Sequence, residues 1–130
     1  MRLLLVPALL LSACVPRDAP PDAAYRAFAR AAAERDADEA WRLLSARTRA
    51  WMEARGRAAA AAAPGVVAAS GPRLLLGDAA LATAPVREIE VLRREGDAAV
   101  LRVVDAAGAA AEVRMVREGG AWRVELAEPR

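Results

Sequence analysis

The sequence predicts an α+β domain in which three helices come first and an antiparallel sheet of about four strands follows. Apolar residues recur at helical spacing through most of residues 22–63, whereas apolar and polar residues alternate from Val86 onward. Turn signals rich in glycine and acidic residues recur at intervals of about eleven or twelve residues in this second part. A run of helices followed by a run of strands favours helices packed on one face of a single sheet.

The first predicted helix covers residues 22–35. Asp22 follows two prolines and is a candidate N-cap, and Tyr25 and Phe28 lie at helical spacing on one apolar face. The charged segment that ends at Asp38 interrupts this pattern. We expect Asp38 to cap a second, short helix that runs to about Leu44.

A third helix is predicted to begin at Ser45, its cap, and to end at Pro64-Gly65, because the residue before a proline is pushed out of the helical region. Residues 65–85 have no clear period. Within them, Leu74–Leu76 is either a short buried segment or an edge strand, and the rest has the composition of a loop.

Alternating segments follow, separated by turn signals at residues 95–97, 105–108 and 118–120. This pattern is typical of an antiparallel meander. The residues predicted to face the helices are all apolar: Ile89, Val91, Leu101, Val103, Val113, Met115, Trp122, Val124 and Leu126.

The amino end of the chain has a distinct pattern of charged, apolar and small residues. Arg2 precedes an apolar run that Pro7 interrupts and that ends at Cys14, the one cysteine of the chain. The run is about half of the ~20 residues that a membrane-spanning helix needs. Small residues stand before Cys14, as they do at a signal cleavage site. Residues 1–13 are therefore predicted to be a signal peptide.

With Leu11-Ser12-Ala13-Cys14 at its end, this segment resembles the signal peptide of a bacterial lipoprotein. The resemblance implies that Cys14 becomes the mature N-terminus and carries a diacylglycerol and usually a third acyl chain, such as palmitate. Two or more chains anchor a protein stably to a membrane. The alternative is an ordinary secretory signal with an incidental cysteine, although no second cysteine exists with which Cys14 could form a structural disulfide.

The same resemblance implies a place in the bacterial cell envelope. Val15 stands where an aspartate would signal retention at the inner membrane, which favours the outer membrane and a domain that faces the periplasm. Residues 14–21 comprise the lipidated cysteine and a tether that its three prolines make stiff. Residues 22–130 are then the size of one domain with one core.

Composition limits the classes of function. All 19 basic residues are arginine. They nearly balance the 17 acidic residues, and the two signs are mixed along the chain. Such a chain has no electrostatic footprint for nucleic acid. It also has no histidine, the commonest general base and the commonest metal ligand. We therefore expect no metal site and no cofactor.

The order of the segments resembles a known family. The resemblance is carried by Ala24-Tyr25-Arg26-Ala27-Phe28, by residues 35–45, by Gly96–Val100 and by the closing segment 120–126. These are similar to the nuclear transport factor 2-like superfamily, in its branch of small bacterial lipoproteins, over residues 21–128. The resemblance implies three helices that close one side of a strongly curved sheet, forming a cone that often contains a cavity.

Family members include enzymes, such as ketosteroid isomerase and scytalone dehydratase, and proteins that only bind or that dimerise through the sheet. The fold alone does not decide between these functions. The residues that are candidates to line the cavity are bulky: Tyr25, Phe28, Trp41, Trp51, Met115 and Trp122. The other interpretation is that they fill the core, where a large aromatic side chain buries ~150–250 Å².

An isomerase-like pair would combine the phenol of Tyr25 with the carboxylate of Asp38. A general base needs a dry pocket that raises its pKa, and the charged neighbours of Asp38 favour a helix cap instead. The mature domain lacks both histidine and cysteine. We therefore expect no catalytic residue.

The outward face of the sheet is predicted to carry four aliphatic residues among charges of both signs: Leu92, Val100, Val104 and Val116. This face indicates a homodimer or docking of another envelope protein, and a mixed solvated face is the alternative. We expect a non-enzymatic envelope lipoprotein whose tethered domain binds a small apolar ligand or a protein partner. An isomerase or hydrolase that uses the cavity of the cone is the second hypothesis.

Overall fold

The computed structural model describes residues 19–65 and 85–128. The predicted signal peptide, Cys14, most of the tether and the Leu74–Leu76 segment lie outside the described residues. Within the described ranges, none of the helices has both the length and the apolar character needed to cross a bilayer.

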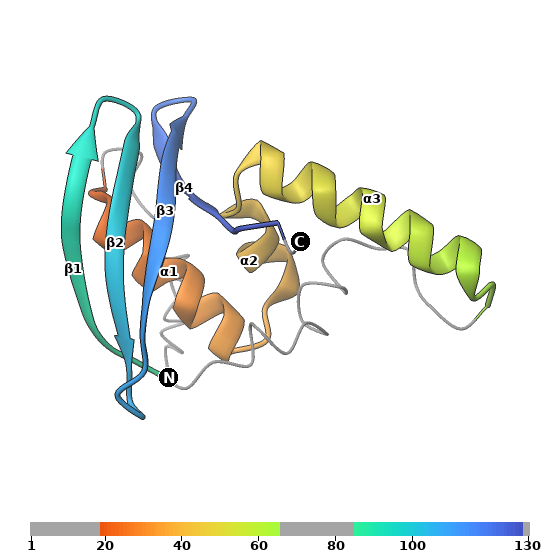
Figure 1. Cartoon of the computed structure of the whole chain (residues 1–130), viewed down its shortest axis with the longest axis horizontal. Helices are drawn as coiled ribbons and strands as arrows, with labels where there is room; N and C mark the ends of the chain where they lie inside the picture. The colour runs from red at the N-terminus through yellow and green to blue at the C-terminus, as the bar shows by residue number, and fades with distance from the viewer. Residues whose placement is uncertain (1–18, 66–84, 129–130) are drawn as a thin grey trace, which may run out of the picture.

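In the described residues, three helices precede four strands (Figure 1). The elements are α1 (Pro21–Ala33), α2 (Ala37–Arg42), α3 (Ala46–Ala62), β1 (Val86–Glu95), β2 (Ala98–Asp105), β3 (Ala110–Glu118) and β4 (Ala121–Glu125). The strands form one open antiparallel sheet in the order β1-β2-β3-β4. The predicted α+β class and the meander of four strands are therefore confirmed.

The first two helices begin differently from the prediction. Pro21 is the first residue of α1, and the preceding Pro20 makes no side-chain cap, so the prediction of Asp22 as N-cap was wrong. Proline suits the first helical position because its φ is already helical and it has no N–H to leave unpaired. Asp22 lies in the first turn, where its negative charge interacts favourably with the helix dipole.

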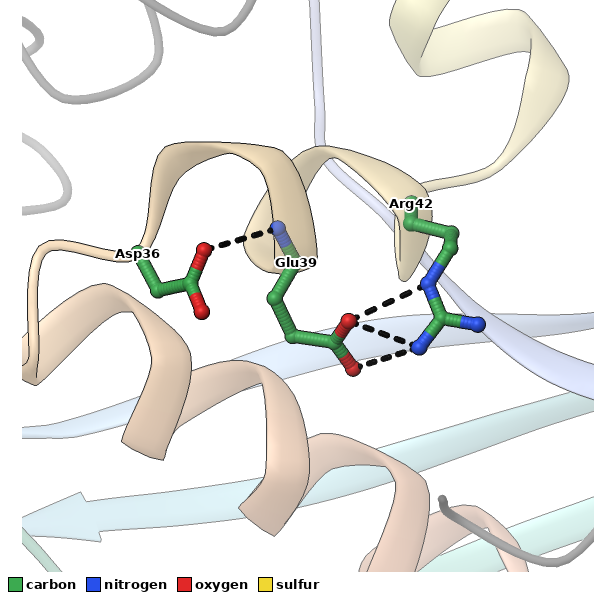
Figure 2. A network of polar contacts seen from close by, with 3 residues as sticks. All are labelled: Asp36, Glu39 and Arg42. Atoms are coloured by element: carbon green, nitrogen blue, oxygen red, sulfur yellow. Dashed lines mark hydrogen bonds and ion pairs between the residues drawn. The ribbon is translucent and has the colours of Figure 1, made fainter. Parts of the chain in front are cut away.

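Asp36, rather than the predicted Asp38, caps α2. Its Oδ1 accepts a hydrogen bond from the backbone N–H of Glu39 at 3.2 Å (Figure 2). Asp38 lies exposed within the first turn of the helix. The Glu39 carboxylate also accepts hydrogen bonds from the guanidinium of Arg42 at 2.6–3.1 Å. These contacts are local and solvated, and they hold together a helix of six residues.

Ser45 caps α3 as predicted and joins this helix to the sheet. Its Oγ accepts a hydrogen bond from the N–H of Thr48 and donates one to Thr48 Oγ1, which accepts a third from the N–H of Leu126. Ser45 and Thr48 are both fully buried. The carboxylate of Glu118, at the end of β3, accepts a hydrogen bond from the N–H of Ala46. The start of α3 is thus fixed to the end of the sheet.

Helix α1 packs across one face of the sheet against β1, β2 and β4, and α2 packs on α1. Helix α3 contacts the sheet at β4 and then extends away from it (Figure 1). Leu44, between α2 and α3, forms a parallel bridge with Val124 of β4. We call the face of the sheet that α1 covers the inner face, and the opposite face the outer face.

The core lies between α1 and the inner face. It contains Leu101, Met115 and Val124, which are fully buried, together with Phe28 of α1 and Trp122 of β4. Ile89, Val113 and Leu126 are partly buried and pack against this cluster. Most of the residues predicted to face the helices therefore do so.

Strand β1 departs from strict alternation. Its register with β2 shifts between Val86 and Glu88 and again between Val91 and Arg93. Val91, predicted to face the helices, is 41% exposed because it lies on the edge strand, and the neighbouring Leu92 is 39% exposed. An extra residue of this kind reverses the side to which later residues point. Arg94 consequently pairs with Ala99 of the inner face.

Candidate functional site

Half of the candidate cavity residues belong to the buried core. Phe28, Met115 and Trp122 are 3%, 0% and 4% exposed and lie in one cluster with Leu101 and Val124. Side chains in such clusters touch one another at close-packed density. In the described residues, α1 and the inner face are thus joined by packed apolar side chains.

The other three candidates, Tyr25, Trp41 and Trp51, are partly buried and pack against the edge of this core. The ring of Tyr25 lies 6.0 Å from the ring of Phe28 at a tilt of 46°, a favourable arrangement for two aromatic side chains. Burial raises the pKa of the Tyr25 phenol above its ordinary value of 10.0, because the charged form loses its hydration.

This shift predicts an alkaline weakness of the fold. The phenol of the unfolded chain ionises near pH 10, whereas the folded chain still holds its proton there, so stability falls as the pH rises above 10. Tyr25 is the one tyrosine of the chain, so the absorbance of the phenolate reports this group alone. We expect ionisation above pH 10.0 and a weaker alkaline loss of stability in Tyr25→Phe. Ionisation at or below that pH would contradict the burial of the ring.

Trp122 has a partner that the sequence pattern did not reveal. The guanidinium carbon of Arg94 lies 5.2 Å from the centre of its ring, a cation–π distance. Strict alternation from Val91 predicts Arg94 on the outer face, and the register shift brings it to the inner face instead. Ala99, the cross-strand partner of Arg94, is small and leaves room for the long side chain.

A hollow of about 270 Å³ lies between the first turns of α3 and the end of the sheet. Trp51 and Arg47 of α3 line one side, and Glu112, Arg114 and Glu125 line the other. The indole Nε1 of Trp51 is buried and has no hydrogen-bond partner among the described residues. Charges of both signs surround the hollow, so it does not favour a ligand of one charge.

The outer face carries the predicted mixture of aliphatic and charged residues. Val100 and Val116 are half-buried there. Leu92, also predicted to point outward, is exposed, but it is the extra residue at the register shift of β1 and has no cross-strand partner. Val104, also predicted to point outward, is only 5% exposed, although it lies outside the core cluster. An outward position in the register is therefore not enough to make this residue available to a partner.

The charged side chains of the outer face are exposed or half-buried and cover all four strands: Glu88, Glu90, Arg93, Glu95, Arg102, Glu112, Arg114, Arg123 and Glu125. Arg114 and Glu125 form an ion pair at 2.9 Å between β3 and β4. A second hollow, of about 240 Å³, lies among Arg93, Glu95, Ala98, Val100 and Arg114. Small residues of β2 form its floor.

The buried polar side chains of the described residues are those of Ser45 and Thr48, which bond to each other and to the backbone. Asp38 is exposed to solvent in the first turn of α2. In the described residues, no three potential metal ligands lie close together. The chemistry that these residues offer is apolar packing on the inner face and ion pairing on the outer face.

Comparison with protein-family models, with curated proteins and with solved structures gave no match to this chain. Similarity to the nuclear transport factor 2-like superfamily thus remains a prediction from the residues.

Proposed function

We propose that this chain is a lipoprotein of the bacterial cell envelope whose folded domain works by binding a protein while tethered to the membrane. The observation that carries the proposal is the position of Cys14, directly after a short apolar run and the small residues Ser12 and Ala13. Acyl chains on this cysteine anchor the domain, and the proline-containing tether spaces it from the bilayer. The absence of aspartate after Cys14 favours the outer membrane.

Two features of the domain support binding through a surface. Phe28, Met115 and Trp122 occupy the space between α1 and the inner face. The protein's own side chains therefore fill the place where the resemblance predicted a ligand cavity. On the outer face, Val100 and Val116 lie among charges of both signs, and Leu92 is exposed at the register shift of β1, directly before the outer-face residue Arg93. Apolar residues surrounded by charged ones are typical of protein contact surfaces.

A photo-crosslinking residue in place of Leu92 tests the proposed surface in intact cells. We expect a discrete light-dependent adduct in the membrane fraction, because Leu92 is exposed and directly precedes Arg93, which lies on the outer face. The control carries the same residue in place of Ala54, which is exposed on α3. An adduct of equal yield at both positions, or none at Leu92, would contradict binding through the outer face.

A further inference from the structure

The first residues of β3 have a free edge. The registers pair Arg114–Glu118 of β3 with β4, whereas Ala110–Val113 pair only with β2 among the described residues. In an antiparallel sheet, the N–H and C=O groups of alternate residues point to opposite neighbours. Some backbone groups of Ala110–Val113 therefore point to a side on which no described strand lies (Figure 1).

Strand β4 leaves β3 at Glu125 because the chain beyond it is bound to α3. The N–H of Leu126 donates a hydrogen bond to Oγ1 of Thr48, a buried residue of α3, at 3.0 Å. The chain thus turns toward α3 instead of continuing along β3. The position beside Ala110–Val113, in the line that β4 leaves, is open in the described part of the sheet.

A hollow adjoins this open position. It measures about 270 Å³, and Glu112 of β3 lines one side of it while Leu126–Glu128 line another. Trp51 of α3 also lines the hollow, and its buried indole Nε1 has no acceptor among the described residues. Leaving a buried N–H unpaired is unfavourable. The strand edge and the indole thus offer unused hydrogen-bonding groups around one hollow.

The cross-strand position next to Glu112 selects a charge. Glu90, Arg102 and Glu112 lie opposite one another on β1, β2 and β3, so the signs alternate along this row. Opposite charges in such positions stabilise a pair of strands. The next position of the row, on the far side of Glu112, is empty among the strands that the structure describes. A basic residue there would continue the alternation.

The charged residues around the hollow agree with a basic residue at this point. Arg114 and Glu125 pair with each other at 2.9 Å. The lining that remains contains one positive side chain, Arg47, and two negative ones, Glu112 and Glu128. The balance left after the ion pair is therefore one negative charge. A basic side chain beside Glu112 would neutralise it.

We propose that the edge of β3 at Ala110–Val113 binds an extended segment of a protein partner, which adds to the sheet antiparallel to β3 and places a basic residue opposite Glu112. Main-chain hydrogen bonds supply the affinity in this mode of binding, and side-chain positions supply the specificity. The inference rests on the proposed function, because Glu112 and Glu125 belong to the outer face and the segment extends that contact surface.

The free edge of β1 is less suited to strand addition. Its register shifts between Val86 and Glu88 and again between Val91 and Arg93. Extra residues of this kind break the regular spacing of edge groups and are a usual protection of edge strands. Among the described strands, the regular edge of β3 is therefore the better template.

Synthetic peptides test the proposal on the purified full-length chain in detergent. The first peptide alternates lysine and valine, and the second alternates glutamate and valine. A third has the first sequence with methylated backbone nitrogens, which cannot donate hydrogen bonds. Fluorescence anisotropy of labelled peptides measures binding. We expect the lysine peptide to bind about three- to tenfold more tightly than the glutamate peptide, and the methylated peptide not to bind.

A charge reversal at the selecting position gives the decisive comparison. The Glu112→Arg chain should prefer the glutamate peptide, because the residue opposite the new arginine must then be acidic. Glu88→Arg is the matched control, since Glu88 is an equally exposed glutamate of the outer face on the far strand β1. That variant should keep the preference for lysine. Matching circular dichroism spectra verify that both variants are folded.

Hydrogen exchange locates the bound peptide. The lysine peptide should slow amide exchange in residues 110–113 and leave β1 unchanged, because added backbone bonds protect only the edge that makes them. Slower exchange in β1 alone would place the binding at the other edge. Amides of residues 110–113 that are already protected without peptide would show that the chain itself covers this edge. Either result would overturn the inference.

The remaining outcomes also decide the matter. Backbone pairing depends little on sequence, so a wild-type chain that binds neither unmodified peptide has no strand-addition site. Equal binding of the methylated peptide, or a preference that Glu112→Arg does not reverse, would likewise overturn the inference. A Leu92 adduct obtained together with these failures leaves the proposed function standing. Peptide binding at residues 110–113 without that adduct removes the outer-face proposal and keeps the edge of β3 as a site.

Discussion

Replacing Trp122 by alanine is expected to lower the free energy of unfolding by about 3–5 kcal/mol, the usual cost of deleting a large buried aromatic side chain. Trp122 is 4% exposed and lies in one core cluster with Leu101, Met115 and Val124, whose side chains are all smaller. The alanine side chains of this interior are too short to fill the cavity that the indole ring leaves. The melting temperature should fall by more than ~10 °C in a domain of this size.

Urea unfolding followed by circular dichroism measures this loss on the purified proteins under matched conditions. Arg94→Ala is the matched control, since it removes the cation over the ring and leaves the ring in place. We expect that variant to lose only about 0.5–1 kcal/mol, as other exposed cation–π pairs do. An unchanged midpoint for Trp122→Ala would mean that β4 does not pack against the core.

The second large effect is expected at the other end of the chain. Cys14→Ser should abolish membrane association, because a serine hydroxyl provides no sulfur to carry the diacylglycerol. One acyl chain binds a membrane only marginally and two or more bind stably, so losing the modification removes the anchor rather than weakening it. No helix of the described residues is long and apolar enough to span a bilayer in its place.

Cell fractionation with a high-salt wash measures this effect, since salt removes proteins held by charge alone. Ser12→Ala is the matched control: it keeps a small residue before the cleavage site and keeps Cys14 itself. That variant should remain in the membrane fraction. Recovery of Cys14→Ser in the washed membranes would rule out the lipid anchor.

Much of the fold was predictable because local signals and burial agree. The alternating pattern of Leu101 and Val103 predicted β2 and its buried side correctly. Ser45 was predicted as a cap because a serine stands at the break between two apolar patterns, and its side chain accepts the expected hydrogen bond. Glycine at positions 96 and 120 marked turns where the backbone takes a positive φ.

Other features depend on a choice between two local arrangements that the sequence allows equally. Asp36 and Asp38 are both capping residues by type, and which one caps α2 is decided by where α1 ends and the chain turns. Arg94 reaches the inner face through an extra residue in β1, and no residue type marks that shift. The charge order of the outer face needed the register between strands, which alternation alone does not supply.

The candidate site was predictable only as a set of residue types. The bulky residues were recognised, but their distribution between the core and its edge depends on how the helices lie. Phe28 is buried because α1 crosses the sheet, whereas Trp51 is partly buried because α3 extends away from it (Figure 1). Both residues were recognised by their size, and the helical periodicity around Trp51 is much weaker than that around Phe28.

The intact mass of the protein extracted from membranes tests the lipid tether most directly. We predict a polypeptide that begins at Cys14 and carries the added mass of at least two acyl chains, recovered wholly with the membranes. A soluble polypeptide with a free thiol on Cys14, or one that still begins at Met1 without any lipid, would contradict the proposal that this domain works from a lipid anchor.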